Sequence, residues 1–211
     1  GEGCLSRFNG MWAFALYDTR ERTLFLARDR FGVKPLYYWN SPSGFFAFAS
    51  EIKQFTVLPG WQAQVNGQRA YDFLVFGLSD HTEETLFHGV HQLQAGHCAR
   101  LPVIRSTDRY SPGLLQRHQW YRLTPEPFSG TRTSAHEEFL RRFSASVELR
   151  LRADVPVGSC LSGGLDSSSI VCVAHRLLAQ RGAQTMQKTF SACAKVDRYD
   201  ERKWVEEVIR S

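Results

Sequence analysis

Short apolar segments separated by polar turns occupy the first fifty residues of the chain. The four segments are rich in aromatic and branched side chains and cover residues 11–17, 23–28, 36–39 and 44–49. The stretches between them carry polar residues, glycine and proline, which are typical of turns. Short strands joined by tight turns pair with their chain neighbours, so this pattern predicts an antiparallel sheet.

The pattern then changes from extended to helical and back. Residues 50–78 have a more helical character, and residues 71–76 predict an apolar helix. Two further extended segments are predicted at residues 85–93 and 96–101, because short apolar runs return there.

A polar, turn-rich stretch divides the chain. Residues 102–133 contain four prolines and few apolar positions, which is typical of a boundary between domains. We therefore predict a first domain at residues 1–115, a linker at 116–133 and a second domain at 134–211.

A helical period begins at Ser134. Ser134 and Glu137 fit the S-x-x-E capping box that opens many helices. Apolar side chains then recur at helical spacing, which predicts a helix with one buried face that ends at Asp154. They are Phe139, Leu140, Phe143, Val147 and Leu151.

Strand and helix alternate beyond that helix. The order is a strand at 155–161, a turn at 162–167, a helix at 168–180, a strand at 188–193 and a helix at 200–209. This alternation predicts a parallel sheet that binds ligands at the carboxyl ends of its strands. The predicted fold class is thus an α+β antiparallel-sheet domain followed by an α/β parallel-sheet domain.

Composition excludes several classes of protein. Hydrophobic residues make up 43% of the chain, which is enough for folded cores. The net charge of +5 is spread along the chain without a basic run, so we predict no nucleic-acid partner. No apolar run approaches the roughly 18 residues of a membrane helix, so we predict no membrane partner. The five cysteines form no C-x-x-C pair and indicate reduced, mostly buried thiols in a cytoplasmic protein.

The strongest local signal is the segment Ser162-Gly-Gly-Leu-Asp-Ser-Ser168 between the predicted strand and helix. Gly163 and Gly164 carry no Cβ, so an anion can approach the backbone closely. We expect the N–H groups of Ser167 and Ser168 to open the helix and to face that anion.

Side chains of the same segment add to this expectation. Ser162 and Ser167 supply hydroxyl donors, and Asp166 places a carboxylate where Mg²⁺ bridges phosphates. A plain Ser-Gly-Gly turn that caps a helix is the alternative, but the position between strand and helix favours a phosphate site. The segment lacks the Gly-Lys-Ser/Thr ending of a Walker A loop.

The S-G-G-x-D-S segment resembles the loop of the ATP pyrophosphatase-loop enzymes. Four flanking segments are similar to those of glutamine-hydrolysing asparagine synthetases, and together they cover essentially the whole chain in the same order. They are residues 10–15, 29–38, 48–53 and 150–158.

This resemblance implies two domains and one overall reaction. The first is a class II glutamine amidotransferase domain, an αββα sandwich that releases ammonia from glutamine. The second uses ATP and Mg²⁺ to convert aspartate to β-aspartyl-AMP, which ammonia then attacks. The implied partners are the small molecules glutamine, aspartate and ATP, and a homodimer of the full-length protein.

The resemblance also assigns residues. It implies that ATP or pyrophosphate is bound by Leu161, Ser162, Gly163, Gly164, Asp166 and Ser167. It also implies that Asp166 binds Mg²⁺. Ala192, late in the second strand, is implied to contact adenine. The amidotransferase nucleophile of the family is an amino-terminal cysteine, whereas Cys4 precedes Leu-Ser-Arg-Phe. We therefore predict that Cys4 packs in a core, that the chain carries no catalytic amidotransferase residue, and that it is an interior fragment.

Two other functions remain open at this point. One is a related adenylating synthetase with another acceptor, such as a β-lactam or peptide-cyclising enzyme. The other is a non-catalytic remnant that binds a nucleotide. The acceptor pocket that separates these readings is expected beyond Ser211.

Overall fold

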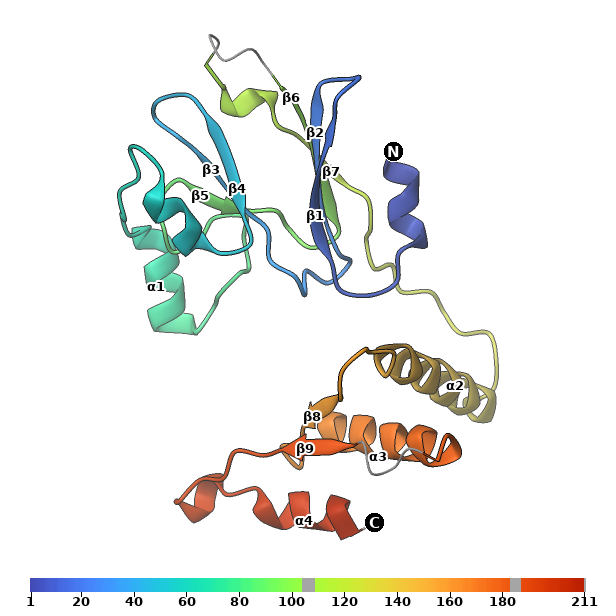
Figure 1. Cartoon of the computed structure of the whole chain (residues 1–211). Coiled ribbons are helices and arrows are strands. Elements are labelled where there is room, and N and C mark those ends of the chain that lie inside the picture. Colours follow the sequence, from blue (N-terminus) through green and yellow to red (C-terminus); the bar gives the residue numbers. More distant parts are fainter. Residues whose placement is uncertain (104–108, 183–186, 211) are drawn as a thin grey trace. The chain divides into compact units, whose positions relative to one another are not determined.

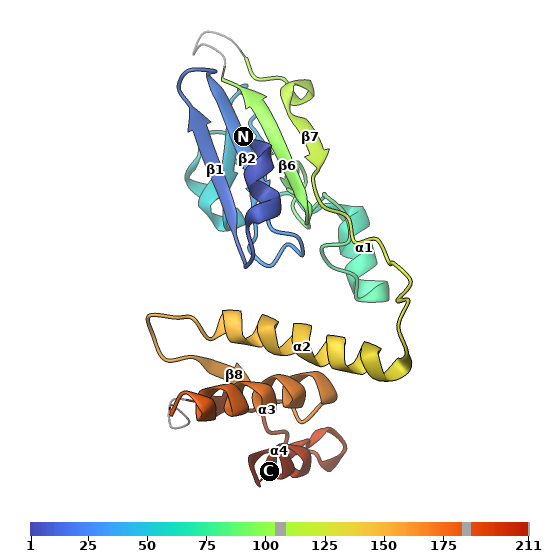
Figure 2. The same cartoon turned by 90° about the vertical axis from the view of Figure 1, so that its right-hand side faces the viewer.

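Two units make up the chain in this computed structural model, Gly1–Pro125 and Glu126–Ser211 (Figures 1 and 2). The structure describes residues 1–103, 109–182 and 187–210. Part of the predicted boundary stretch, residues 104–108, therefore lies outside the described residues. Each unit is considered by itself below.

Two antiparallel sheets form the first unit. One sheet has the order β1-β2-β6-β7, and the other has the order β4-β3-β5 (Figure 1). The strands of the first sheet are β1 (Ala13–Asp18), β2 (Thr23–Arg28), β6 (His97–Pro102) and β7 (Gln116–Gln119). Those of the second are β3 (Tyr37–Asn40), β4 (Phe46–Ala49) and β5 (Val90–Gln92).

The expectation of a single sheet for the first four strands is therefore wrong. The hairpin of β1 and β2 is present, with Ala15 opposite Leu26. The turn after β2, however, does not return the chain to the same sheet. It leads instead to β3, whose partners are β4 and β5.

Helical segments complete the first unit. These are the 3₁₀ helices η1 (Glu2–Arg7), η2 (Ile52–Val57) and η3 (Pro112–Leu114), and the α-helix α1 (Gly67–Phe76). The predicted helix at 71–76 is confirmed, and it begins earlier because the Asn66 side chain caps its first turn. Gly77, at φ +66°, ends it in the left-handed conformation that helix C-caps favour.

The alternation of side chains along β2 buries both faces of its sheet. Phe25 and Ala27 pack with Leu5 of η1, and Cys4 lies against the same cluster. Leu26 points to the opposite face and packs with Leu36, Leu93 and Ala99. Cys4 therefore packs against the core as predicted, but it is only partly buried. The expectation of mostly buried thiols is wrong, because Cys98 alone of the five is buried and Cys160, Cys172 and Cys193 are exposed.

The second sheet has a core of its own. Trp39 of β3, Phe55 of η2 and Val90 of β5 are buried together. Phe46 of β4 packs against the cluster that contains Leu26. The order of layers is therefore η1, first sheet, second sheet, η2, which agrees with the sandwich that the resemblance implies.

The turn after β2 depends on two buried charged residues. The Asp29 side chain, 1% exposed, accepts hydrogen bonds from four backbone N–H groups at 3.0 to 3.2 Å. The donors are Trp12, Phe31, Val33 and Lys34. The Arg28 guanidinium donates to the carbonyl groups of Gly32, Lys34 and Leu93. These hydrogen bonds satisfy most backbone polar groups of residues 31–34. They therefore fix the conformation of the turn.

Strand β7 lies in the stretch that was expected to be a linker. It pairs with β6, with Cys98 opposite His118. The sequence did not predict this strand, because Gln116-Arg-His-Gln119 shows no alternation of apolar and polar side chains. All four residues are polar and exposed. The first unit therefore extends past residue 115, and only residues after β7 connect it to the second unit.

The second unit is a short α/β segment. Its elements are α2 (Arg132–Arg150), β8 (Gly158–Cys160), α3 (Leu165–Gln180), β9 (Lys188–Phe190), η5 (Asp197–Tyr199) and α4 (Arg202–Arg210). Strands β8 and β9 pair in parallel, with Cys160 opposite Phe190. Leu161, Val171 and Val205 form the buried cluster between β8, α3 and α4.

The start, end and burial of α2 differ from the prediction. Thr131, and not Ser134, caps the helix, and its hydroxyl accepts from the Ser134 N–H at 3.2 Å. The last helical residue is Arg150 rather than Asp154. Val147 is buried, but Phe139 is 69% exposed. The periodicity predicted a helix correctly, but its apolar face is covered only in part: Phe143 and Leu151 are half-buried, and Phe139 and Leu140 are exposed.

None of the described helices combines the length and the apolar character that crossing a lipid bilayer requires.

We predict that Asp29→Asn destabilises the chain by about 3 kcal/mol at pH 7, because an amide NH₂ group then faces backbone donors that stay buried. Urea denaturation measures this loss. The matched control is Asp18→Asn, because the half-buried Asp18 carboxylate accepts two backbone N–H groups, from Arg20 and Glu21. It should cost less than about 1 kcal/mol, and equal losses in the two variants would contradict the argument.

The same carboxylate predicts a pH dependence. Burial raises the pKa of Asp29, but the hydrogen bonds from Lys34, Val33, Trp12 and Phe31 outweigh burial and lower the pKa overall. A lowered folded-state pKa contributes stability above the unfolded value of about 3.9, and this contribution is lost as the pH falls through the folded value. The difference in stability between the native chain and Asp29→Asn should therefore shrink below pH ~4.

Candidate functional site

The segment with two adjacent glycines joins β8 to the start of α3. Gly164 is the N-cap residue of α3, so the helix begins at Leu165, three residues before the predicted start. The N–H groups of Leu165, Asp166 and Ser167 belong to the first helical turn and have no intrahelical acceptor. No hydrogen bond from another described residue occupies them either. Three free donors at a helix N-terminus are an arrangement that favours an anion.

One of the two expected N–H donors is not free. The Ser168 N–H donates to the Gly164 carbonyl at 3.0 Å and is therefore part of the helix. The free donors are the N–H groups of residues 165–167, so the predicted Ser167 is among them, whereas Ser168 is not. Ser168 contributes a different feature, a buried hydroxyl oxygen with no hydrogen-bond partner among the described residues. Nothing in the sequence marked this hydroxyl, since burial depends on the packing of α3.

The two serine hydroxyls predicted to bind phosphate lie next to each other. Their oxygens, Ser162 Oγ and Ser167 Oγ, are 3.0 Å apart. The Ser162 N–H donates to Ser167 Oγ at 3.2 Å, and Ser167 Oγ also contacts the Gly164 carbonyl at 3.2 Å. These bonds close the loop into one turn, and both serines still have exposed polar atoms for a ligand.

Gly163 has a structural reason to be glycine. Its φ is +80°, which side chains with a Cβ rarely adopt. A Cβ at this position would lie 2.7 Å from the Cβ of Trp204 and 3.3 Å from the Glu201 carbonyl. Helix α4 therefore packs directly behind the loop. This contact explains why residue 163 is glycine without the expected close approach of an anion. Gly164 differs, because a Cβ there would meet only the Ser162 hydroxyl, at 3.5 Å.

Leu161 contributes through its backbone. Its side chain is 1% exposed and lies in the core cluster of this unit. Its N–H donates to the Phe190 carbonyl, and its carbonyl accepts from the Ser191 hydroxyl at 2.6 Å. Leu161 thus ties the loop to the end of β9.

Ala192 lies beyond β9 rather than late in it, because β9 ends at Phe190. The segment is still adjacent to the loop, since Ser191 is bonded to Leu161. No hydrogen bond between described residues occupies the N–H or the carbonyl of Ala192. The two parallel strands therefore bring the loop and a backbone segment with free polar groups to the same edge of the sheet.

Asp166 is exposed in the first turn of α3. An acid at this position is favoured by the helix dipole. Among the described residues, no three histidine, cysteine, aspartate or glutamate side chains gather as a metal site. A cation here would therefore be held by Asp166 together with oxygen atoms of a bound phosphate.

Asp200 and Glu201 immediately precede α4, which begins at Arg202 rather than at the predicted residue 200. The Asp200 carboxylate accepts from the N–H and the guanidinium of Arg202 at the start of α4. These bonds lower the pKa of Asp200. The segment matters to the site indirectly, because the Glu201 carbonyl lies behind Gly163.

Comparison with known proteins identifies both units. A family model described as glutamine amidotransferase domain matches residues 1–110. A second, described as asparagine synthase, matches residues 138–211 and so includes the loop.

Individual relatives agree with these matches. A putative glutamine-hydrolyzing asparagine synthetase of Mycobacterium bovis is 36% identical over 180 residues, which are 83% of this chain and 26% of that protein. A putative asparagine synthetase of Methanocaldococcus jannaschii is 29% identical over 211 residues, or 99% of this chain and 38% of that protein. The amidase chyE of Penicillium rubens is 32% identical over 186 residues, or 85% of this chain and 25% of that protein.

The chain spans 25% to 38% of the length of these relatives. Its amidotransferase match and its synthase match follow one another in a single chain, as the sequence motifs predicted. The chain therefore belongs to the family of glutamine-hydrolysing asparagine synthetases.

Proposed function

We propose that the chain takes part in ATP-dependent amide synthesis, and that its second unit binds the phosphates of ATP at the Ser162–Ser167 loop. The observation that carries this proposal is the anion site itself. Three unoccupied N–H groups and two hydroxyls surround one end of α3. Free backbone donors and the helix dipole favour a negatively charged group at that end.

Different residues of the loop contact different parts of the nucleotide in this proposal. The N–H groups of residues 165–167 and the hydroxyls of Ser162 and Ser167 bind phosphate oxygens. The free N–H and carbonyl of Ala192 suit the edge of adenine, which offers both a donor and an acceptor. Leu161 holds these two segments together and makes no side-chain contact with the nucleotide.

Asp166 is the residue that would hold Mg²⁺. Its carboxylate is a hard oxygen ligand of the kind that Mg²⁺ prefers, and the ion usually completes its shell with substrate phosphates and water. When bound, Mg²⁺ offsets the negative charge that develops on the leaving pyrophosphate. The exposed position of Asp166 leaves room for both the ion and the phosphates.

The reaction that fits the family is the amidation of aspartate. A β-carboxylate oxygen of aspartate attacks the α-phosphorus of ATP, and the bond to pyrophosphate breaks. Ammonia from glutamine then attacks the acyl carbon, and AMP leaves with the electron pair of the acyl–oxygen bond. The first unit would belong to the glutamine-hydrolysing part and the second to the adenylating part.

Another acceptor is the second candidate. The similarity to the amidase chyE of Penicillium rubens, at 32% identity, supports this candidate, because that protein is named for a different activity. The loop chemistry is the same in both cases, because adenylation does not depend on the acceptor. A non-catalytic nucleotide-binding role would also retain the loop. Pyrophosphate release from ATP that depends on one acceptor, aspartate or another carboxylic acid, distinguishes these functions.

Several features of the whole protein follow from the proposal. We infer a cytoplasmic location and a homodimer, as in a biosynthetic enzyme with small-molecule substrates and no nucleic-acid or membrane partner. We also propose that residues 1–115 belong to the amidotransferase part and residues 134–211 to the synthetase part.

We predict that Asp166→Asn removes most of the gain in ATP affinity that Mg²⁺ provides. The change keeps the shape of the side chain and deletes one negative charge, so the expected loss is about tenfold, or roughly 1.4 kcal/mol. Calorimetric titration of the chain with ATP, with and without Mg²⁺, measures it. Glu137→Gln, which removes one charge from α2, is the control and should leave the titration unchanged. Native Mg²⁺ dependence in Asp166→Asn would exclude Asp166 as the metal ligand.

We predict that Gly163→Ala lowers both the stability and the ATP affinity of the second unit, because the added Cβ displaces α4 and distorts the loop. Gly182 is a matched control, since its φ is +67° and no atom lies within 4 Å of the added Cβ. Gly182→Ala should cost about 1 kcal/mol through backbone strain alone. Gly163→Ala should cost about 1–3 kcal/mol more through overpacking.

The Trp204 side chain provides a second check on this contact. Trp204→Gly removes the Cβ that would clash and should restore part of the ATP affinity of Gly163→Ala. Thermal melting and ATP titration of the single and double variants measure the coupling. Independent effects of the two changes would show that α4 does not shape the loop.

A further inference from the structure

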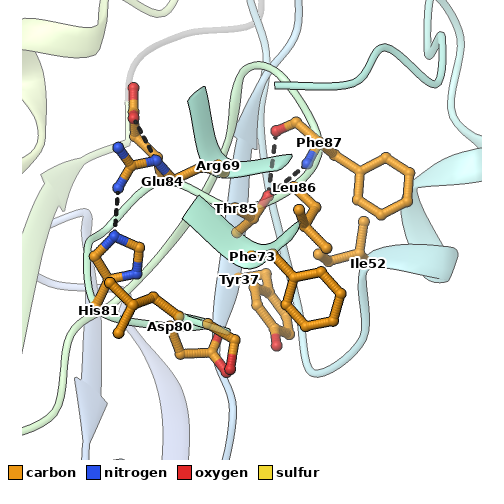
Figure 3. Close-up of a pocket in the computed structure, with 12 residues that line it drawn as sticks. Tyr37, Ile52, Arg69, Phe73, Asp80, His81, Glu84, Thr85, Leu86 and Phe87 are labelled. Carbon is orange, nitrogen blue, oxygen red and sulfur yellow. Dashed lines mark hydrogen bonds and ion pairs between the residues drawn. The ribbon is translucent and has the colours of Figure 1, made fainter. Parts of the chain in front are cut away.

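Helix α1 of the first unit turns its charged side chains inward. The side chains of Arg69 and Asp72 are only 14% and 11% exposed, and they form an ion pair at 2.9 Å. Asp72 also accepts a hydrogen bond from Gln68 at 2.9 Å and is bonded to His81 at 3.1 Å. Figure 3 shows Arg69 directed toward His81 and Glu84 of the segment that follows α1. Both charged residues of α1 are therefore paired within the unit.

Another side of α1 carries exposed apolar side chains. Tyr71, Leu74 and Val75 are 54%, 80% and 53% exposed. Residues three and four positions apart share one side of a helix, so Gly67 and Ala70 continue this side toward the start of α1. We call these five residues the outer face of α1. It contains no charged residue, which is the reverse of an ordinary surface helix, whose apolar stripe faces the core.

Two apolar residues at the end of α1 enlarge the outer face. Phe76 and Leu78 are 63% and 46% exposed. With Tyr71, Leu74 and Val75 they expose on the order of 500 Å², since a fully exposed aromatic side chain presents roughly 150–250 Å² and an aliphatic one somewhat less. Apolar patches of several hundred Å² are often functional.

We propose that the outer face of α1 binds the same face of a second copy of this chain, with the two helices antiparallel. Two such patches bury about 1,000 Å² together, which is the area that a specific interface needs. The sizes of the side chains fit this arrangement. Antiparallel pairing places Gly67 and Ala70 of one copy against the larger Leu74 and Val75 of the other. Small residues at such a contact let the helix axes approach to about 8 Å.

Charge disfavours two other occupants of the outer face. A charged peptide would find no opposite charge there, because Arg69 and Asp72 neutralise each other. A helix that lies in a membrane surface carries free lysine or arginine on its polar side, whereas Arg69 is held by Asp72 and Thr82. An uncharged, self-complementary surface suits a second copy. The proposal gives the homodimer inferred above a surface and does not use the nucleotide loop, so either proposal can fail without the other.

The test measures association of the 211-residue chain by sedimentation equilibrium. We expect a reversible dimer at roughly 1–100 µM, since the interface lies at the small end of the range. Leu74→Glu should raise the dissociation constant at least about a hundredfold, or tenfold for each of two symmetric positions where a charge meets apolar surface. A native chain that stays monomeric over this range overturns the proposal.

Leu16→Glu is the matched control. Leu16 belongs to β1, is 53% exposed and lies outside the outer face of α1. The same substitution there should leave the dissociation constant unchanged. A dimer that is lost in Leu16→Glu but native in Leu74→Glu would place the interface at β1 and overturn the assignment to α1.

A pair of variants tests the orientation of the helices. Ala70→Lys should also dissociate the dimer, because Ala70 lies beside Leu74 of the second copy. A mixture of Ala70→Lys and Leu74→Glu should form a dimer with one copy of each, because lysine then meets glutamate at one contact and the other contact is native. Native mass spectrometry separates this mixed dimer by its mass. Failure of the mixture to associate contradicts the antiparallel pairing.

Thermal melting at a concentration where the chains are monomeric checks the fold. Leu74 is 80% exposed, so Leu74→Glu should melt as the native monomer does. A lower melting temperature in Leu74→Glu, without a dimer of the native chain, would show that another part of the same chain covers α1. That result would also overturn the proposal.

Discussion

The buried pair Arg28 and Asp29 determines how the first unit is connected. Asp29 collects four backbone N–H groups, and Arg28 donates to carbonyls of the same turn and to Leu93. A turn without these bonds would leave polar backbone groups unpaired between two apolar layers, which is costly. With them, the chain passes from one sheet to the other, and the two sheets pack face to face around Leu26. The sandwich therefore depends on polar bonds at its crossing point as much as on its core.

The second unit uses a different constraint, which is steric. The loop between β8 and α3 has polar groups on its outer side and helix α4 on its inner side. Gly163 lets α4 approach to contact distance, and Val205 of α4 joins Leu161 in the core. The free donors at the start of α3 are thus held in place by packing of α4 against the loop. A loop preorganised in this way loses less entropy when it binds.

The loop in the second unit presents N–H and hydroxyl donors at a helix N-terminus, an arrangement that favours anions. The net charge of +5 did not indicate this arrangement, since it depends on a few groups that the fold brings together.

The sequence by itself determined the elements and the family. The alternation of apolar segments predicted the hairpin of β1 and β2, and the strand–helix alternation predicted the parallel pair β8 and β9. The Ser-Gly-Gly-Leu-Asp-Ser segment predicted the loop because its chemistry is local, so a few consecutive residues suffice to show it.

Only the tertiary structure decided which strands share a sheet, where the helices begin and why Gly163 is glycine. Strand β7 was missed because its four residues are polar and it is stabilised by pairing with β6. The start of α2 depends on the Thr131 hydroxyl, and the shape of the loop depends on Trp204, which is 41 positions away in the chain. Periodicity reports contacts between near neighbours, whereas these features arise from contacts between residues far apart in the chain.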